Sequence, residues 1–437
     1  MSRNRCDGLL AKVDFPLYTL QTLTNRHVLV AGGGGASNTG VANGFEVFEL
    51  SHNGHKFIAE EVMRYETGPN VVMTCSVRDV GSRTFLAAGQ ESHCQLYQVT
   101  PKLADAAELR RGSLQINGVR RRRRTVSEND NISKDSNRNP TEKRMTFLIR
   151  PTDSVQTDFG DDPLQRVVRI SNNGKLVATG GMDGKVRVWS FPKMQLLFEL
   201  EGHTKELDDL DFSPCDTKLV TIAKDGFAFV WGTAARGAPL MKLTCQPPDG
   251  TKYLFRRCRF APIEDAPDSY RLFTIANPLT RSGKQRGLLQ QWAAAGAGGA
   301  AGSAGGAGEG GAARAALAAE ALSALAVRDD GRFVAVGTMF SGSVDIYIAF
   351  SLQRVVHVEN AHRMFVTGLA FLPVRGGGAA GAPPASRSEA ALLSISVDNR
   401  LVVHTVPYPG TMPAWVAVIL IIFVLFCTFS ICSYLGI

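Results

Sequence analysis

The chain has 437 residues, of which 44% are hydrophobic and 20% are charged, and its formal net charge is +8. This composition excludes a chain that is disordered throughout, and the length allows a large core or several domains. The eight cysteines are scattered without a C-x-x-C pair, so neither a zinc site nor a disulfide framework is predicted. Isolated thiols of this kind fit a reducing compartment.

The first predicted feature is a pair of strands in residues 15–50, joined by a long glycine-rich connection. An ordinary hairpin needs only two to five turn residues, so this connection is too long for a simple turn. It combines four glycines with three polar side chains: Gly32, Gly33, Gly34, Gly35, Asn38, Thr39 and Asn43.

The chemistry of this connection argues against a phosphate site, because residues 31–45 contain no Lys or Arg. Glycines with positive φ could turn backbone carbonyls inward, where they would join the amide and hydroxyl oxygens. Such a neutral oxygen cage suits a weakly hydrated cation such as potassium, whereas calcium or magnesium would call for carboxylates. A long turn without any ligand is the alternative interpretation.

Residues 101–160 are polar and basic, and they include five consecutive arginines at 120–124. Such a run is most often a solvated segment. Nuclear targeting, or contact with acidic lipid or nucleic acid, are the other interpretations. We expect residues 101–160 to be a flexible insertion, because this composition buries too little apolar surface to fold alone.

Internal repeats predict the architecture of the remaining chain. Residues 175–191 resemble residues 218–233, and Trp189 and Trp231 lie 42 residues apart with His203 between them. This spacing matches the period of a propeller blade, about 40–45 residues. Looser copies bring the number of units to seven: residues 15–50, 62–99, 165–192, 205–233, 252–293, 320–350 and 365–407. We therefore expect residues 1–407 to form an all-β, seven-bladed WD-repeat β-propeller.

Two further stretches interrupt the repeats. Residues 293–317 are almost entirely Ala and Gly, and residues 375–389 are rich in Gly, Ala, Pro and Ser. Both are predicted to be flexible insertions on the ring, although the alanine-rich pieces could form short helices.

Catalytic motifs are missing from the sequence. His203 with Asp225 or Asp183 could suggest acid–base chemistry, but in a propeller blade such residues more often form a buried structural hydrogen-bond network. The sequence contains no nucleophile elbow, no H-E-x-x-H and no G-x-x-x-x-G-K-[ST] motif. A hydrolase or an NTPase is therefore poorly supported.

The last predicted element is a membrane anchor at residues 415–437, which follows a short linker at 408–414. Residues 415–437 contain no charged side chain, and about 20 apolar residues span a bilayer as a helix. The run is too long and too uniformly apolar for a buried core helix. Trp415 and Tyr434 are placed as interfacial residues, and the Lys and Arg content before the helix predicts a cytosolic N-terminal domain.

Several stretches resemble the Sec-twelve family, whose animal members are known as prolactin regulatory element-binding proteins. The resemblance covers nearly all of the chain except the three insertions, whose lengths and composition depart from the family. The matching pieces are residues 15–21, 31–44, 87–98, 155–168, 177–189 and 342–353, together with the C-terminal anchor.

This resemblance implies an exchange factor, anchored in the endoplasmic reticulum membrane, for the Sar small GTPase that starts COPII coat assembly. In the family, the loop of the first blade is catalytic and binds potassium. Carried over to this chain, the resemblance implies Asn38, Thr39, Gly40, Val41 and Asn43 as the catalytic residues, and Asn38, Thr39, Gly40 and Asn43 as the potassium ligands. Gly32, Gly33, Gly34 and Gly35 would shape the base of the loop.

Two alternatives remain open from the sequence. A membrane-tethered WD-repeat adaptor without exchange activity is the first, because propellers often only bind partners and a fold does not fix a function. Nucleic-acid binding through the arginines at 120–124 is the weaker one, and nucleic acid is an unlikely partner.

Overall fold

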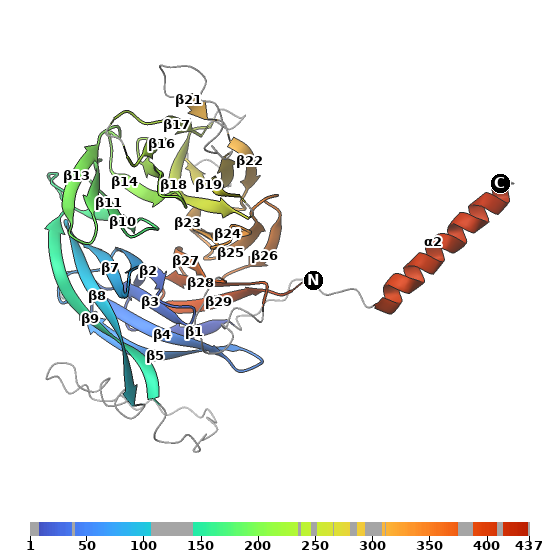
Figure 1. Cartoon of the computed structure of the whole chain (residues 1–437), viewed down its shortest axis with the longest axis horizontal. Coiled ribbons are helices and arrows are strands. Elements are labelled where there is room, and N and C mark those ends of the chain that lie inside the picture. The colour runs from blue at the N-terminus through green and yellow to red at the C-terminus, as the bar shows by residue number, and fades with distance from the viewer. Residues whose placement is uncertain are drawn as a thin grey trace.

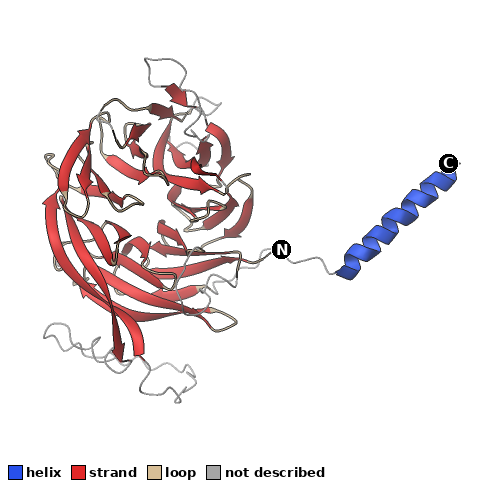
Figure 2. Cartoon of the chain, in the orientation of Figure 1, coloured by secondary structure: helices blue, strands red, loops and turns tan. Residues whose placement is uncertain are grey.

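The computed structural model describes residues 8–36, 40–105, 143–234, 237–245, 251–264, 266–279, 286–292, 308–310, 312–374, 388–408 and 414–435. These residues form seven sheets arranged as a ring, antiparallel except for one short added strand, with one helix that lies apart from the ring (Figure 1). Figure 2 shows that the ring is built from strands. The predicted seven-bladed propeller is therefore confirmed.

The first three sheets follow one another in the chain, and each contains four strands in sequence order. The first sheet is β2 (Leu17–Thr22), β3 (His27–Gly32), β4 (Gly44–His52) and β5 (Phe57–Glu66). The second is β6 (Thr74–Val80), β7 (Arg83–Gln90), β8 (His93–Asp105) and β9 (Lys143–Gln156). The third is β10 (Gln165–Ile170), β11 (Leu176–Gly181), β12 (Val186–Ser190) and β13 (Gln195–Leu200).

The next three sheets continue the same order, and the fourth gains an additional short parallel strand. The fourth sheet is β14 (Leu207–Phe212), β15 (Lys218–Ala223), β16 (Phe227–Gly232) and β17 (Met241–Thr244), with β21 (Gly308–Gly310) at its edge. The fifth is β18 (Tyr253–Ile263), β19 (Ala266–Pro278), β20 (Leu288–Trp292) and β22 (Ala312–Leu317). The sixth is β23 (Leu322–Val327), β24 (Phe333–Thr338), β25 (Val344–Ile348) and β26 (Arg354–Val358).

The seventh sheet joins the two ends of the ring. It contains β27 (Val366–Phe371), β28 (Ala390–Ser396) and β29 (Arg400–Val406), and its fourth strand is β1 (Leu9–Lys12) from the start of the chain. Strand β1 pairs with β29 in antiparallel register. Strand β1 therefore covers the edge of β29, forms a short outer edge of four residues itself, and ties the beginning of the chain to the last sheet.

A hydrophobic core fills each interface between neighbouring sheets. One example lies between the first and second sheets, where Leu29 and Phe45 pack with Leu86 and Tyr97. Another lies between the seventh and first sheets, where Leu17 and Val30 pack with Leu393. Burial of alternate side chains in such layers is the main stabilising contribution to the ring.

The antiparallel order gives the ring two distinct faces. The first strand of every sheet lines the central channel. One face carries the connections between second and third strands, such as 33–43, and those from one sheet to the next, such as 157–164; we call it the loop face. The other carries the remaining hairpins, such as 53–56 and 171–175, and the end of β29; we call it the exit face.

Structural hydrogen bonds hold the repeat residues in place. Trp231 donates its indole N–H to Thr221 at 2.9 Å, and His203 lies 2.9 Å from both Thr221 and the Asp225 carboxylate. The structural interpretation of His203 is therefore confirmed, with Asp225 rather than Asp183 as its partner. Asp183 instead pairs with Arg187 at 2.7 Å.

The predicted insertions need correction at their ends. Residues 101–105 and 143–156 of the first one belong to β8 and β9, which form a long hairpin, and residues 308–310 and 312–317 of the second belong to β21 and β22. Backbone pairing with a neighbouring strand explains this, because it does not depend on an apolar sequence. Residues 106–142, 293–307 and 375–387 lie outside the described residues.

The helix α2 (Ala414–Leu435) begins one residue before the predicted anchor region 415–437 and covers most of it. Across the described part of the chain, no helical segment combines the length and the apolarity that a membrane span requires.

Candidate functional site

The glycine-rich connection between β3 and β4 lies on the loop face. Its ends are described and follow directly from the two strands. Of the predicted site residues, Asn38 and Thr39 lie outside the described residues, together with Ser37. The structure therefore shows how the base of this loop is built.

The glycines at the base fulfil two different requirements. A Cβ atom on Gly32 would overlap the carbonyl oxygen of Pro16, and one on Gly33 would overlap the side chain of Asn43. Gly35 and Gly40 have open space around them, but their φ angles are 79° and 74°, a conformation that glycine adopts without strain. The sequence-based expectation of positive φ is thus confirmed at these two positions.

Asn43 fastens the loop at its base. Its side-chain oxygen accepts a hydrogen bond from the Gly35 N–H at 2.9 Å, and its amide nitrogen donates to the Gly35 carbonyl at 3.2 Å. The same nitrogen lies 2.9 Å from the Gly68 carbonyl and 3.0 Å from the Pro69 carbonyl. Asn43 is buried, with 5% of its surface exposed, so these bonds form away from bulk water.

The backbone of Asn43 extends this attachment. Its carbonyl accepts the Thr67 N–H at 3.0 Å, and the Thr67 hydroxyl donates to the Asn70 carbonyl at 2.8 Å. The glycine loop is therefore joined to the neighbouring connection at residues 67–70. Val41 adds a half-buried apolar contact to the core between the seventh and first sheets, whereas Gly40 is exposed.

These contacts decide which residues could hold a cation. Both polar atoms of the Asn43 side chain are engaged with the backbone, and its oxygen already accepts the Gly35 N–H. The side chain is thus used to build the base of the loop, and the role of Asn43 as a potassium ligand stays a prediction. The exposed Gly40 carbonyl and the oxygens of Asn38 and Thr39 are the remaining candidates from the sequence.

A buried carboxylate lies close to the loop in β4. Glu46 has 1% of its side chain exposed, and its carboxylate lies 2.5 Å from the Arg64 guanidinium. Burial raises the pKa of Glu46 to about 7, although Arg64 opposes this shift. The carboxyl group therefore titrates near neutral pH, three residues from Asn43.

We expect this titration to make the stability of the ring depend on pH. The native state holds the Glu46 proton more tightly than the unfolded state, so this contribution is complete below pH 4.5 and is lost as the pH rises through 7. Between pH 5 and pH 8 the wild-type chain should lose about 2 kcal/mol of unfolding free energy through this group. Chemical denaturation of Glu46→Gln should show a flatter profile, with exposed Glu91→Gln as the control; identical profiles would contradict this assignment.

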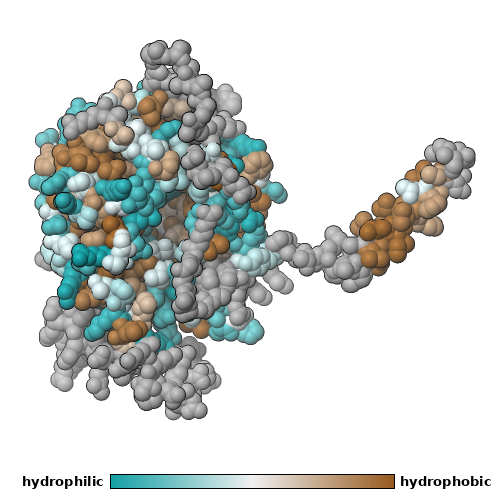
Figure 3. All heavy atoms as spheres, in the orientation of Figure 1, coloured by the Kyte–Doolittle hydropathy of each residue, from teal (hydrophilic) through white to brown (hydrophobic). Residues whose placement is uncertain are grey.

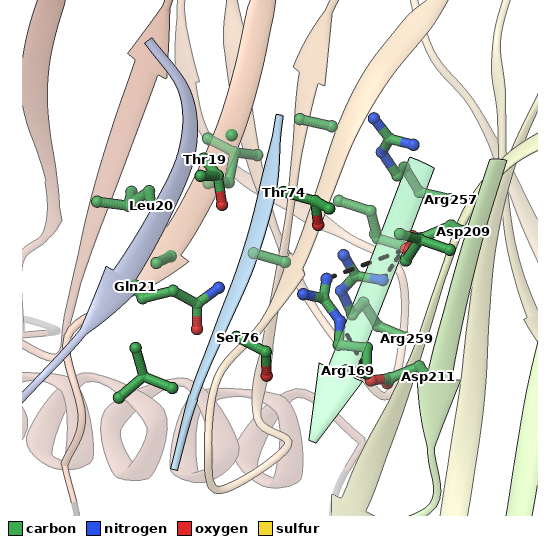
Figure 4. A pocket seen from close by; sticks show the side chains of 18 of the residues that line it. Thr19, Leu20, Gln21, Thr74, Ser76, Arg169, Asp209, Asp211, Arg257 and Arg259 are labelled. Carbon is green, nitrogen blue, oxygen red and sulfur yellow. Dashed lines mark hydrogen bonds and ion pairs between the residues drawn. The ribbon is translucent and has the colours of Figure 1, made fainter. Parts of the chain in front are cut away.

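The central channel forms the second conspicuous polar feature. Its cavity has a volume of about 410 Å³. Figure 4 shows Arg169, Asp209, Asp211, Arg257 and Arg259 on one wall, with Thr19, Gln21, Thr74 and Ser76 on the other. Charged side chains in the middle of a ring need partners, because burial without compensation is costly.

Ion pairs across three sheets supply those partners. Asp209 of β14 lies 2.5 Å from Arg259 of β18 and 4.0 Å from Arg169 of β10. Burial alone would raise the pKa of Asp209, but Arg259, Arg257 and Arg169 outweigh it and hold the pKa below its ordinary value. Asp211 has fewer such contacts, and burial raises its pKa. The network links the third, fourth and fifth sheets.

The comparisons with known proteins agree with this architecture. The family model for the WD domain, G-beta repeat, matches residues 160–190 and 194–232, which lie in the third and fourth sheets. With seven four-stranded blades around a channel and structural Trp and His hydrogen bonds, the chain is a WD-repeat propeller.

Full-length relatives identify the family. The chain is 32% identical over 414 residues to the guanine nucleotide-exchange factor SEC12 of Rattus norvegicus, covering 94% of this chain and 93% of the relative. It is 33% identical, over the same coverage, to the guanine nucleotide-exchange factor SEC12 of Mus musculus. SEC12-like protein 1 of Arabidopsis thaliana is 34% identical over 18% of this chain. The chain belongs to the SEC12 family.

Proposed function

We propose that the chain is a guanine nucleotide-exchange factor for a small GTPase. Similarity to SEC12 exchange factors over 94% of the chain is the observation that carries this function. The glycine loop is the catalytic element in this proposal, because it is a long connection fastened at its base on an otherwise regular ring. An exchange factor needs no covalent chemistry of its own.

The partner in this proposal is a Sar-type GTPase at the endoplasmic reticulum, where its activation starts COPII coat assembly. The resemblance of the sequence to the Sec-twelve family supports this choice. The exchange factor would bind the nucleotide-free GTPase more tightly than the GDP-bound one, and the same coupling free energy would weaken GDP binding. A loop held by Asn43 loses less conformational entropy on docking than a free one.

Titration calorimetry tests this coupling directly. We expect the full chain in detergent to bind nucleotide-free Sar-type GTPase at least about 10-fold more tightly than the GDP-loaded form, which is within the usual range of coupling. Equal affinity for both forms would instead indicate a membrane-tethered WD-repeat adaptor without exchange activity.

We further propose that potassium stiffens the loop, held by oxygens of Asn38, Thr39 and Gly40. The loop offers neutral carbonyl, amide and hydroxyl oxygens and contains no carboxylate, and such ligands suit potassium. We expect GDP release catalysed by the chain to be several-fold slower when potassium is replaced by sodium at equal ionic strength. The Asn38→Ala variant should lose this difference, and spontaneous GDP release should be the same in both salts. Equal catalysed rates for the wild-type chain would contradict the role of potassium.

The helix α2 is proposed as a single-pass membrane anchor with the ring in the cytosol. Residues 415–437 contain no charged side chain. Apolar side chains are exposed on all sides of the described helix, including Phe423, Phe426 and Phe429, and Figure 3 shows its hydrophobic surface. A helix that is apolar all round is stable only when that surface is covered, and lipid would cover it.

A further inference from the structure

The chain leaves the ring on one particular face. If α2 is anchored in a membrane as proposed, this face lies toward the membrane. Strand β29 is the third strand of its sheet, so Val406 lies on the exit face. Residues 407–413 connect it to α2 and reach at most about 25 Å when fully extended. The glycine loop lies on the opposite face. The short connection therefore places the exit face, and not the loop face, near the bilayer.

In the described hairpins and strand ends of the exit face, the exposed charges are mainly basic. They come from hairpins of the first, second, third and sixth sheets and from the start of β26: Lys56, Arg83, Lys175, Lys193, Arg332 and Arg354. Asp79, Glu264 and Asp329 are the exposed acidic residues in the described hairpins of this face. The sheets that carry the basic residues include the first and the sixth, which are the neighbours of the seventh sheet, where the chain leaves the ring.

Four of these cations have no ion pair within the part of the chain that the structure describes. Arg332 lies 3.3 Å from Glu389, and Arg354 lies 3.5 Å from Asp345. In contrast, Lys56, Arg83, Lys175 and Lys193 have no acidic partner among the residues that the structure describes. Their charge is therefore available to an external anion.

The loop face has the opposite character. Among the described loops and strand ends of this face, the exposed acidic residues are Asp14, Glu66, Glu91, Asp161, Asp162, Glu201 and Glu359, and the exposed basic residues are Lys12, Lys205, Lys252, Arg286 and Arg363. The described exposed charges of the two faces thus differ in sign. A ring with one acidic and one basic face would be oriented by a negatively charged surface.

We propose that the exit face binds an anionic lipid surface through Lys56, Arg83, Lys175 and Lys193, and that this contact holds the ring against the membrane with the glycine loop facing the cytosol. The inference rests on the proposed membrane anchor. Anionic headgroups attract basic groups within a Debye length, and the anchor keeps the exit face within that range. The sequence between β8 and β9, which contains the five arginines at 120–124, starts and ends on this same face.

Hydrogen–deuterium exchange of the full chain in lipid nanodiscs tests this orientation. One set of discs contains neutral phosphatidylcholine, and the other contains about 30% phosphatidylserine. We expect the amides of residues 53–56, 171–175 and 191–194 to exchange at least about three-fold more slowly in the anionic discs, and about 0.5 M salt should remove the difference. The amides of residues 157–164 and 201–206 should exchange equally in both.

Charge reversal provides the matched variants. The triple variant Lys56→Glu, Lys175→Glu and Lys193→Glu should lose the protection in anionic discs, and the loop-face variant Glu66→Lys, Glu91→Lys and Asp162→Lys should keep it. Exchange of the core strands reports whether each variant is folded. Equal exchange in both kinds of disc, or protection of the loop face, would overturn the proposal.

Two further outcomes distinguish failure of the lipid-binding proposal from failure of the membrane anchor or of the exchange activity. Failure of the wild-type chain to enter the discs would refute the anchor and the orientation together, while GDP release in detergent would test the exchange activity on its own. Protection of the exit face by duplex DNA, but not by anionic discs, would assign the basic residues to nucleic acid and overturn the lipid proposal.

Discussion

Replacing Asn43 with alanine should lower the rate of catalysed GDP release by about 100-fold. The Asn43 side chain holds Gly35, Gly68 and Pro69 through one accepted hydrogen bond and two N–H donors shared among three carbonyls, and each of these three groups contributes about 1 kcal/mol. A loss of about 3 kcal/mol of loop order corresponds to about two orders of magnitude in rate. Release of fluorescent GDP from the partner GTPase measures this effect.

Two companion variants make the Asn43 result specific. Asn43→Asp keeps the acceptor but replaces the donating amide, so it should lose activity as well. Asn53→Ala changes an asparagine in a hairpin of the exit face, and it should release GDP at the wild-type rate. Full activity of Asn43→Ala would show that the loop works without this attachment.

Replacing Asp209 with asparagine should produce the largest loss of stability. Asp209 has 4% of its side chain exposed and pairs with Arg259 and Arg169 from two other sheets. Removing one charge of a buried network leaves the others uncompensated, which costs about 3 kcal/mol of unfolding free energy. Chemical denaturation measures this loss. Glu201→Gln, which removes an exposed pair with Lys185, should change the stability little.

The pH dependence of the Asp209 variant gives an independent check. Because the native pKa of Asp209 lies below its ordinary value, its contribution is present above that ordinary value and is lost as the pH falls through the lower native pKa. The difference between wild type and variant should therefore shrink in acid. A constant difference at all pH values would mean that shape, and not charge, explains the loss.

The inner strands of the ring could be predicted from sequence, whereas the outer strands could not. Trp189 and Trp231 lie in strands whose consecutive residues are mostly buried, and their spacing indicated the repeat. The outer strand β13 (Gln195–Leu200) is largely exposed and has no clear alternation. The predicted units consequently ended too early, and residues 62–66, assigned to the second unit, belong to β5 of the first sheet.

The strand pairing that closes the ring could also not be predicted from the sequence. Strand β1 has only four residues, and its pairing with β29 spans nearly the whole chain. Strand β22 lies within an alanine-rich stretch that shows no strand pattern. In both cases the partner strand, and not the local sequence, determines the structure.

The candidate site was predicted in outline. The glycine loop stays the predicted site, and the positive φ angles expected at its glycines are found at Gly33, Gly35 and Gly40. The need for glycine at Gly32 and Gly33 comes from close backbone contacts, which a sequence does not display. Asn43 was predicted as a potassium ligand, but three carbonyl groups from distant positions surround its amide.

The charged wall of the channel was missed, although a signal was present. Asp208, Asp209 and Asp211 lie in β14, and Arg256, Arg257 and Arg259 lie in β18. Charged residues at positions that should be buried in first strands indicate compensating partners nearby. Only the ring geometry shows that the two groups belong to neighbouring sheets.

The most direct test of the account is the rate of GDP release from a Sar-type GTPase, measured with the full chain and with a variant whose residues 36–41 are replaced by a short Gly-Ser linker. The account predicts fast release with the wild-type chain, and release at the spontaneous rate with the variant, whose ring should remain folded. Equal acceleration by both chains would contradict a catalytic role of the glycine loop, and no acceleration by the wild-type chain would contradict exchange activity itself.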